Sequence, residues 1–358
     1  MKKVLKILLI IVLIIVAAAV GLFGFLSITE YKPAAIEEAE TVKDSASVKL
    51  SVPADGADLK ILSWNIGYAG LGAGSDFIMD GGTHTAAADE ATVKQYLAGI
   101  KEVCGGDYDI LMLQEVDTRC SRTYRIDEKA ELAGGDAVFA LNFSCPFVPN
   151  PSTLIIDPIG MVNSGLLTCS SFDISRAERI SLPCPFSWPL RTANLKRCLL
   201  VSYIPVESSD KQLVLVDLHL EAYDSGEGKI AQTKQLREFI AEEYGKGNYV
   251  IAGGDFNQVF PGSLELYPNS HPDLWKPGEL DDSLLPADEG WKFAYDMNTP
   301  TCRLLNQPYD PSDTENTQHY VIDGFILSPN IELKSAETLD LGFANSDHNP
   351  VRIEITLK

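Results

Sequence analysis

The most regular feature of the sequence is a set of short apolar runs that each lead into a polar residue. These runs are ILSWN (61–65), DILMLQE (109–115), LVLVDLH (213–219), YVIAGGDFN (249–257), YVIDGFIL (320–327) and ANSDHNP (344–350). Apolar and β-branched residues bounded by Gly, Asp and Asn are typical of buried strands. Because a strand end is where a rigid scaffold presents a side chain to a cleft, the pattern predicts sheets whose edge carries polar groups.

Two segments between these runs have the period of an amphipathic helix. Asp89 is suited to cap the first, whose apolar face consists of Val93, Leu97, Ile100 and Val103. The second is predicted at residues 229–244, with its core face formed by Ile230, Leu236, Phe239 and Ile240. Further strands are predicted at residues 165–170, 174–182, 198–206, 321–327 and 351–357. Many strands and few helices indicate mixed sheets stacked face to face, with helices outside.

The N-terminal segment has the pattern of a membrane anchor. Lys2, Lys3 and Lys6 precede residues 7–27, which are uncharged and almost wholly apolar. About 20 helical residues cross a hydrocarbon layer of ~30 Å, so this stretch is long enough to span. Residues 1–6 are then a cytoplasmic basic end, and the catalytic domain lies outside the cytoplasm. A cleaved signal peptide, which would make the protein secreted, is the alternative.

Composition narrows the classes of partner without choosing one. Residues 28–57 are rich in Glu, Ala, Lys, Ser and Pro and are predicted to be an exposed linker to one catalytic domain, 58–358. The formal net charge of −21 argues against a protein that grips a polyanion along its length, but it leaves small phosphorylated substrates open. The seven cysteines include no CxxC, and a pairing of Cys184 with Cys198 is left open.

Two predicted strand ends carry residues that suit a divalent cation. Asn65 and Glu115 each close a strand of the expected core, so their side chains can meet at one rim. Carboxylate and amide oxygens are ligands that Mg²⁺ and Mn²⁺ prefer, and magnesium keeps several waters, so few protein ligands suffice. Asp347 is a third candidate ligand. Each residue alone is more typical of a turn or a solvated surface, so the prediction rests on the joint set.

The remaining polar ends suit proton transfer and phosphate contact. Asp323, accepting from one imidazole nitrogen of His348, would fix its tautomer and raise its basicity, so that His348 takes a proton from water. Asp255 and Asn257 stand two apart and would point the same way on an extended segment, toward the phosphate or the attacking water. His219 would donate a hydrogen bond or a proton to the phosphoryl group.

Taken in chain order, six motifs resemble those of the endonuclease/exonuclease/phosphatase superfamily, namely WNIG, QEVD, DLHLEAY, GGDFNQ, IDGFIL and SDHNP. That superfamily includes deoxyribonuclease I-like nucleases, bacterial sphingomyelinases and inositol polyphosphate 5-phosphatases. The resemblance covers roughly residues 58–358 and implies an α/β fold, a four-layer αββα sandwich, with a Mg²⁺-dependent site at one edge. It implies that Asn65 and Glu115 bind the metal and that Asp323 is the partner of His348.

The resemblance also assigns roles to the other polar ends and leaves the substrate open. It implies a phosphate-contacting or acid role for His219, a water- and phosphate-orienting pair in Asp255 and Asn257, and a closing pair in Asp347 and His348. The tryptophan-cysteine-aspartate-arginine signature of 5-phosphatases is replaced by YVIDGFI, which disfavours a phosphoinositide phosphatase.

The predicted function is therefore a membrane-tethered phosphoesterase that uses Mg²⁺ or Mn²⁺ and attacks a phosphodiester or phosphomonoester with water. A small phosphodiester or a lipid headgroup is the favoured substrate, and Arg122 and Arg125 are candidate phosphate contacts. An endonuclease acting on DNA or RNA is the alternative, and a non-catalytic binding module on the same fold is a third reading. No obligate protein partner is inferred.

Overall fold

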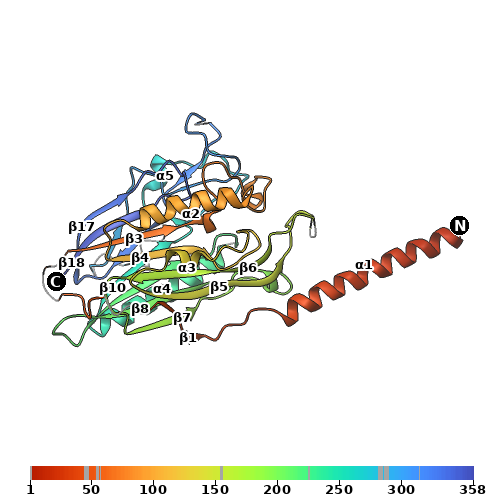
Figure 1. The fold of residues 1–358 in the computed structure, drawn as a ribbon. Helices are drawn as coiled ribbons and strands as arrows, with labels where there is room; N and C mark the ends of the chain where they lie inside the picture. The colour runs from red at the N-terminus through yellow and green to blue at the C-terminus, as the bar shows by residue number, and fades with distance from the viewer. Residues whose placement is uncertain are drawn as a thin grey trace.

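A computed structural model describes residues 2–43, 48–53, 56, 58–153, 156–224, 226–280, 285, 290–313 and 315–358. Two mixed β-sheets pack face to face, and helices cover their outer faces (Figure 1). The α-helices are α1 (Lys2–Ile28), α2 (Glu90–Cys104), α3 (Glu128–Leu132), α4 (Glu227–Gly245) and α5 (Ser263–Leu266). Three short 3₁₀ helices are η1 (Gly67–Ala69), η2 (Ile78–Asp80) and η3 (Leu190–Ala193).

The two large sheets each contain seven strands among the described residues. The first sheet has the order β1 (Ile36–Glu38), β7 (Arg176–Ser181), β8 (Cys198–Pro205), β9 (Gln212–His219), β10 (Tyr249–Asp255), β16 (Asp323–Leu327) and β13 (Lys292–Ala294). The second has the order β17 (Ile331–Thr338), β18 (Val351–Leu357), β3 (Asp58–Asn65), β4 (Ile110–Asp117), β6 (Gly160–Ser170), β5 (Asp136–Val148) and β2 (Glu40–Lys43). Two small ladders pair β11 (Gln258–Val259) with β12 (Gly278–Glu279) and β14 (Cys302–Arg303) with β15 (His319–Tyr320).

Apolar side chains fill the space between the sheets and under the helices. Ile61 and Met112 of the second sheet pack against Leu215 and Phe325 of the first. Helix α2 lies over the second sheet, because its buried face contacts Trp64 and its neighbours, and α4 lies over the first. The predicted four-layer αββα sandwich is confirmed.

Each sheet has a parallel pair at its centre. In the first sheet β9 runs parallel to β10, and His219 stands opposite Asp255. In the second sheet β3 runs parallel to β4, and Asn65 stands opposite Gln114. Parallel neighbours end at the same edge, so four of the polar strand ends are delivered to one place.

The predicted helices form, with one error in the predicted faces. Asp89 caps α2 by accepting a hydrogen bond from the Thr92 backbone N–H, as its position before the apolar stripe indicated. Helix α4 buries Leu236 and Ile240, but Ile230 is 64% exposed, which corrects its predicted core position. The buried stripe of α4 passes instead through Lys229 and Thr233. Both are buried with hydrogen-bond partners, since Lys229 Nζ donates to the Ala222 carbonyl oxygen at 2.8 Å and Thr233 Oγ1 accepts from Gln258 Nε2 at 2.9 Å.

Residues predicted to be a free linker join the sheets at their edges. Strand β1 pairs with β7 and strand β2 pairs with β5, so part of the 28–57 segment is held by the domain. Both strands are only three to four residues long, too short for a period to mark them.

Helix α1 leads away from the domain at one end of the molecule (Figure 1). Its 27 residues are long and apolar enough to cross a membrane, a test that a signal sequence also passes. All seven cysteines are free thiols, and Cys184 is exposed whereas Cys198 is buried.

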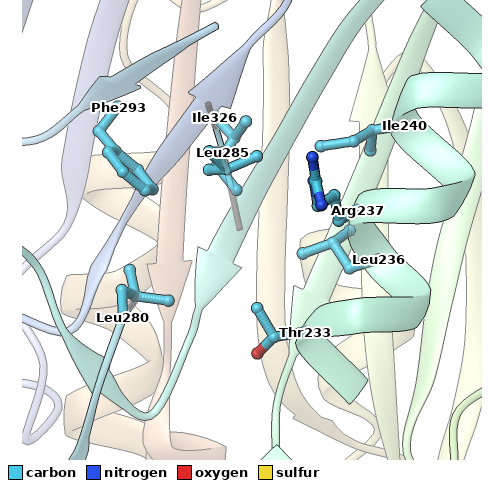
Figure 2. A pocket seen from close by; sticks show the side chains of 8 residues that line it. All are labelled: Thr233, Leu236, Arg237, Ile240, Leu280, Leu285, Phe293 and Ile326. Carbon is cyan, nitrogen blue, oxygen red and sulfur yellow. The ribbon is translucent and has the colours of Figure 1, made fainter. Parts of the chain in front are cut away.

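A small cavity of about 10 Å³ lies between α4 and the strands β13 and β16 (Figure 2). Leu236, Ile240, Phe293 and Ile326 are among its lining side chains. A space of this size holds about one water, so it is a gap in packing and not a ligand site.

Candidate active site

The carboxylate of Asp255, at the end of β10, is the centre of the predicted cluster. Its Oδ2 atom accepts a 3.0 Å hydrogen bond from Asn65 Nδ2. The same oxygen lies 3.5 Å from His219 Nε2 and 3.8 Å from His348 Nε2. Burial and then the neighbouring charge of Asp323 raise the pKa of Asp255 to about 7. Side chains from four strands and a loop therefore meet at one buried acid.

Glu115 reaches this cluster through an irregularity in β4. The register between β4 and β6 shifts between Leu113 and Val116, and Glu115 has a φ of 56°. A positive φ at a non-glycine residue is strained, and such strain persists where the surroundings over-determine it. Glu115 Oε1 accepts a 3.1 Å hydrogen bond from Asn65 Nδ2 and lies 3.9 Å from His219 Nε2.

Asp347 completes the acidic side of the site. Burial, opposed by His348 and reinforced by Glu115, raises the pKa of Asp347 to about 6. The backbone of Gly67 approaches this carboxylate closely, since a Cβ at Gly67 would stand 2.7 Å from Asp347 Oδ1.

The donor set fits a hard divalent cation. Glu115 and Asp347 are acidic side chains at the wall of one cavity, and the charge of Glu115 helps to raise the pKa of Asp347, so a bound cation would favour the ionised form of Asp347. Asn65 is in the predicted place, but its Nδ2 faces the carboxylates and its Oδ1 accepts from the Gly67 backbone N–H at 3.0 Å. Asn65 would offer oxygen to an ion only if its amide turned over, so its ligand role stays a prediction.

The Asp323 and His348 pair forms as predicted. His348 Nδ1 lies 2.8 Å from Asp323 Oδ2, and both side chains are buried. Asp323 is held in turn by Thr301, whose hydroxyl accepts from the Asp323 backbone N–H at 3.1 Å. Burial alone lowers the pKa of His348, but the charge of Asp323 overcomes it and raises this pKa well above the ordinary value. Asp323 therefore favours the protonated form of His348.

His219 has the opposite character. Burial, together with the positive charges of Arg197 and His348, lowers the pKa of His219 well below its ordinary value. A neutral imidazole can still donate from one nitrogen, and Nε2 is the nitrogen that faces Asp255. Of the two roles predicted for His219, donating a hydrogen bond therefore suits it better than donating a proton.

Asn257 lies beside Asp255, but not for the predicted reason. The segment is a turn and not extended, because Asn257 has a φ of 50° and its backbone N–H donates to Asp255 Oδ1 at 2.8 Å. Its Nδ2 donates to the Leu220 carbonyl oxygen at 2.9 Å. Asn257 therefore holds the Asp255 carboxylate in place.

The two predicted phosphate-contacting arginines are placed differently. Arg122 lines the cavity, but its guanidinium makes two 2.9 Å hydrogen bonds to Asp117 and lies 3.5 Å over the Tyr68 ring. Arg125 is exposed, donates to the Arg119 carbonyl oxygen, and is not among the cavity-lining residues. The structure does not bring Arg125 to the site.

Several cavity residues carried no sequence signal. Arg197 donates to the His219 carbonyl oxygen at 3.1 Å and so positions the end of β9. Tyr223 donates to Asp80 Oδ1 at 3.0 Å, and burial raises the pKa of Asp80 to about 7. Tyr68 follows the WNIG motif, and the hydroxyl of Tyr68 has no hydrogen-bond partner among the described residues. Its position directly after that motif is the one sequence signal that could have identified Tyr68.

The cluster forms one end of a cavity of about 450 Å³. Its polar end contains Glu115, His219, Asp255, Asn257, Asp347 and His348. The volume falls in the range of about 300–1,000 Å³ that is usual for small-molecule sites. Buried, convergent polar groups with shifted pKa values in such a cavity are the pattern of an active site.

Comparison with known proteins agrees with this geometry. The sequence pattern of the Endonuclease/Exonuclease/phosphatase family matches residues 62–348. The chain belongs to this family. It is accordingly a metal-dependent hydrolase that acts on ester bonds. The sequence matches none of the curated proteins with which it was compared.

Solved structures of other endonuclease/exonuclease/phosphatase proteins share the fold at low sequence identity. The protein from Beutenbergia cavernae is 16% identical, with a TM-score of 0.53, over 84% of this chain and 72% of its own. That from Bacteroides vulgatus is 15% identical, with a TM-score of 0.51, over 85% of this chain and 100% of its own. That from Leptotrichia buccalis is 14% identical, with a TM-score of 0.51, over 83% of this chain and 99% of its own.

Proposed function

We propose that the protein is a membrane-tethered phosphoesterase that uses Mg²⁺ or Mn²⁺ to hydrolyse a phosphodiester or a phosphomonoester. The observation that carries the proposal is the single cluster around Asp255. It joins the acidic pair Glu115 and Asp347 to the ion pair of His348 and Asp323. Metal-assisted hydrolysis needs this combination of hard oxygen ligands with groups that handle protons.

The residues at the site have separate roles in this proposal. Glu115 and Asp347 would hold the cation, which supplies Lewis-acid polarisation of the phosphoryl oxygens when bound. His219, neutral and with Nε2 facing the cluster, donates a hydrogen bond to a phosphoryl oxygen. His348, cationic and fixed by Asp323, neutralises charge on the phosphate.

The proton of the attacking water goes to Asp255 in this proposal. Sequence reasoning gave this role to His348, but the raised pKa of His348 favours its protonated form, which cannot accept a further proton. Asp255 is held by Asn65 and Asn257, and its pKa near neutrality is that of an effective base. The water oxygen bonds to phosphorus, the bond to the leaving oxygen breaks, and Asp255 Oδ2 receives the water proton.

Helix α1 supports tethering to a membrane. Its apolar stretch follows three lysines, which favours a cytoplasmic N-terminus and a catalytic domain on the other side. The cavity argues against an extended polyanion as substrate. Its two arginines, Arg122 and Arg197, are both paired with carboxylates, and the net charge is −21. These observations favour a small phosphorylated substrate over the endonuclease alternative, which the family itself includes.

A chelator experiment tests the proposed function. The full chain, purified in detergent, is assayed on bis(p-nitrophenyl) phosphate and p-nitrophenyl phosphate with Mg²⁺, with Mn²⁺ and with excess EDTA. We expect hydrolysis of at least one ester with metal and none with EDTA. His348→Ala should reduce the rate about 10²- to 10³-fold, because it removes the group that neutralises charge on the phosphate. His84→Ala is the matched control, because His84 is exposed and pairs with Asp76 away from the cavity wall. Equal rates in both variants would refute the proposal.

A further inference from the structure

The cavity that holds the catalytic cluster extends to the membrane helix. Phe23 and Leu26, in the last turns of α1, are part of its wall together with residues of the catalytic end. Leu26 is 3% exposed and packs in one cluster with Phe143, Val148 and Ile159. The cavity thus connects Asp255 to the C-terminal end of a helix suited to a bilayer.

Much of the remaining wall of this cavity is apolar. Its apolar side chains include Phe143, Val148, Pro149, Ile159, Leu190 and Leu195, and its polar ones include Asn142, Ser164, Thr192 and Asn194. A substrate made only of sugar, nucleotide or inorganic phosphate would leave this surface without a partner, since polar groups gain nothing from apolar walls. The wall fits a molecule with a phosphoester at one end and a hydrocarbon chain at the other.

The contacts of α1 place this apolar wall near the expected membrane surface. Trp188 donates from Nε1 to Ser27 Oγ at 3.0 Å, and its ring centroid lies 6.0 Å from that of Phe23. A few residues on, Glu30 forms ion pairs with Arg191 at 3.3 Å and Lys196 at 3.2 Å. An aromatic residue followed by charges is the usual order at a membrane–water interface.

The rim of the cavity is correspondingly apolar on its outside. Trp188 is 56% exposed and Leu190 is 67% exposed, and both lie beside the end of α1. Exposed apolar residues that continue the surface of a membrane helix are covered when the helix is inserted. When α1 is inserted in a membrane, the bilayer therefore covers Trp188 and Leu190.

From these contacts we infer that the substrate is a membrane phospholipid whose hydrocarbon chain lies in the cavity between Leu26 and the catalytic cluster. The inference rests on the proposed phosphoesterase function. The lipid leaves the bilayer along α1, passes Leu190, and presents its phosphoester to Asp255 and the imidazole of His348. Helix α1 is then both an anchor and a part of the substrate-binding wall.

Chain-length dependence tests this inference without knowledge of the headgroup. The full chain in detergent hydrolyses bis(p-nitrophenyl) phosphate with Mg²⁺, and butyl-, octyl- and dodecylphosphonate are added as inhibitors. Each buried methylene contributes about 0.8 kcal/mol, so burial of only about two of the added methylenes should tighten inhibition about tenfold from butyl to dodecyl. Leu190→Asp and Ala193→Trp, at the mouth of the cavity, should reduce this gain about tenfold or remove it.

Leu266→Asp is the matched control for Leu190→Asp. Leu266 is 52% exposed on α5 and is not part of the cavity wall, so its variant should keep the wild-type dependence on chain length. Partition of the inhibitors into detergent is the same for every variant and cancels in this comparison.

Two failures are distinguishable. Hydrolysis of the soluble ester with inhibition that does not depend on chain length, or with the same dependence in all variants, overturns the lipid inference and leaves the phosphoesterase intact. Absence of metal-dependent hydrolysis of any soluble ester overturns the proposed function, and the lipid inference with it.

Discussion

The parallel pair β9–β10 of the first sheet and the parallel pair β3–β4 of the second both end at the active site. In β9–β10, His219 stands opposite Asp255, and regular pairing alone brings His219 Nε2 within 3.5 Å of the Asp255 carboxylate. In β3–β4, the residue opposite Asn65 is Gln114, and Glu115 enters the site only because the strand is irregular there.

At this irregularity the adjacent side chains of Gln114 and Glu115 make different contacts. Gln114 points between the sheets and donates to Asp217 Oδ1 at 2.7 Å, which joins β4 to β9 across the core. Glu115, with its φ of 56°, turns to the site instead. Under the proposed function, the regular pair supplies groups that handle protons and the irregular pair supplies a metal ligand.

Asp255→Asn is expected to have the largest effect, because it removes the proposed proton acceptor at the end of the regular pair β9–β10. Hydrolysis of a soluble phosphoester should fall about 10³-fold, since the amide cannot accept the proton of water. Calorimetric titration should show Mg²⁺ binding within about tenfold of wild type, because the proposed ligands Glu115 and Asp347 remain. Hydrolysis close to the wild-type rate would remove Asp255 from the proton-accepting role.

Glu115→Gln should produce the reverse pattern in the irregular pair. Mg²⁺ affinity should fall at least about tenfold, measured by calorimetry, because a neutral amide replaces a charged ligand. Higher Mg²⁺ should recover part of the activity, which it should not do for Asp255→Asn. Unchanged Mg²⁺ affinity would place the metal elsewhere.

Gly67→Ala tests how closely the backbone must approach Asp347. Gly67 has a φ of 50°, and the added Cβ would stand 2.7 Å from Asp347 Oδ1. We expect a loss of about 1–3 kcal/mol in the free energy of unfolding, measured in denaturant, and weaker Mg²⁺ binding. Gly134→Ala is the control, since nothing lies within 4 Å of its added Cβ. A variant as stable as this control would contradict the close approach.

Asp80→Asn should have the smallest effect of the four substitutions, and this effect is on the pH dependence of stability. Burial raises the pKa of Asp80 from 3.8 to about 7, so the folded protein binds more protons than the unfolded chain between about pH 4 and 7. This group therefore makes the protein less stable as pH rises through that window. In EDTA, the fall in Tm between pH 5 and pH 8 should be smaller in Asp80→Asn than in wild type.

Asp210→Asn provides the control for the pH experiment, because the Asp210 side chain is 85% exposed. Its Tm should fall with pH as much as that of the wild type. An Asp80 variant that also follows the wild type would mean that Asp80 does not titrate in the folded protein.

Local pattern was enough to locate most of the polar strand ends and the helices, but not every strand. The apolar runs before Asn65 and His219 marked β3 and β9, because an uninterrupted apolar run is a signal of a buried strand. Strand β17 was missed because the alternation in IELKSAET breaks at the register shift between Leu333 and Ser335, and the strand lies at a sheet edge. Its pairing with β18 is a long-range contact that no local period records.

The sequence by itself determined which residues of this protein are available for chemistry and which strands and helices carry them. Tertiary structure decided their surroundings: Asp323 raises the pKa of His348, Asp117 pairs with Arg122, and the cavity reaches Leu26 of α1. The physical reason is that pKa values and cavities depend on burial and on neighbours far along the chain. The spacing of hydrophobic residues follows from the local backbone geometry of a strand or helix, and it is therefore visible in the sequence.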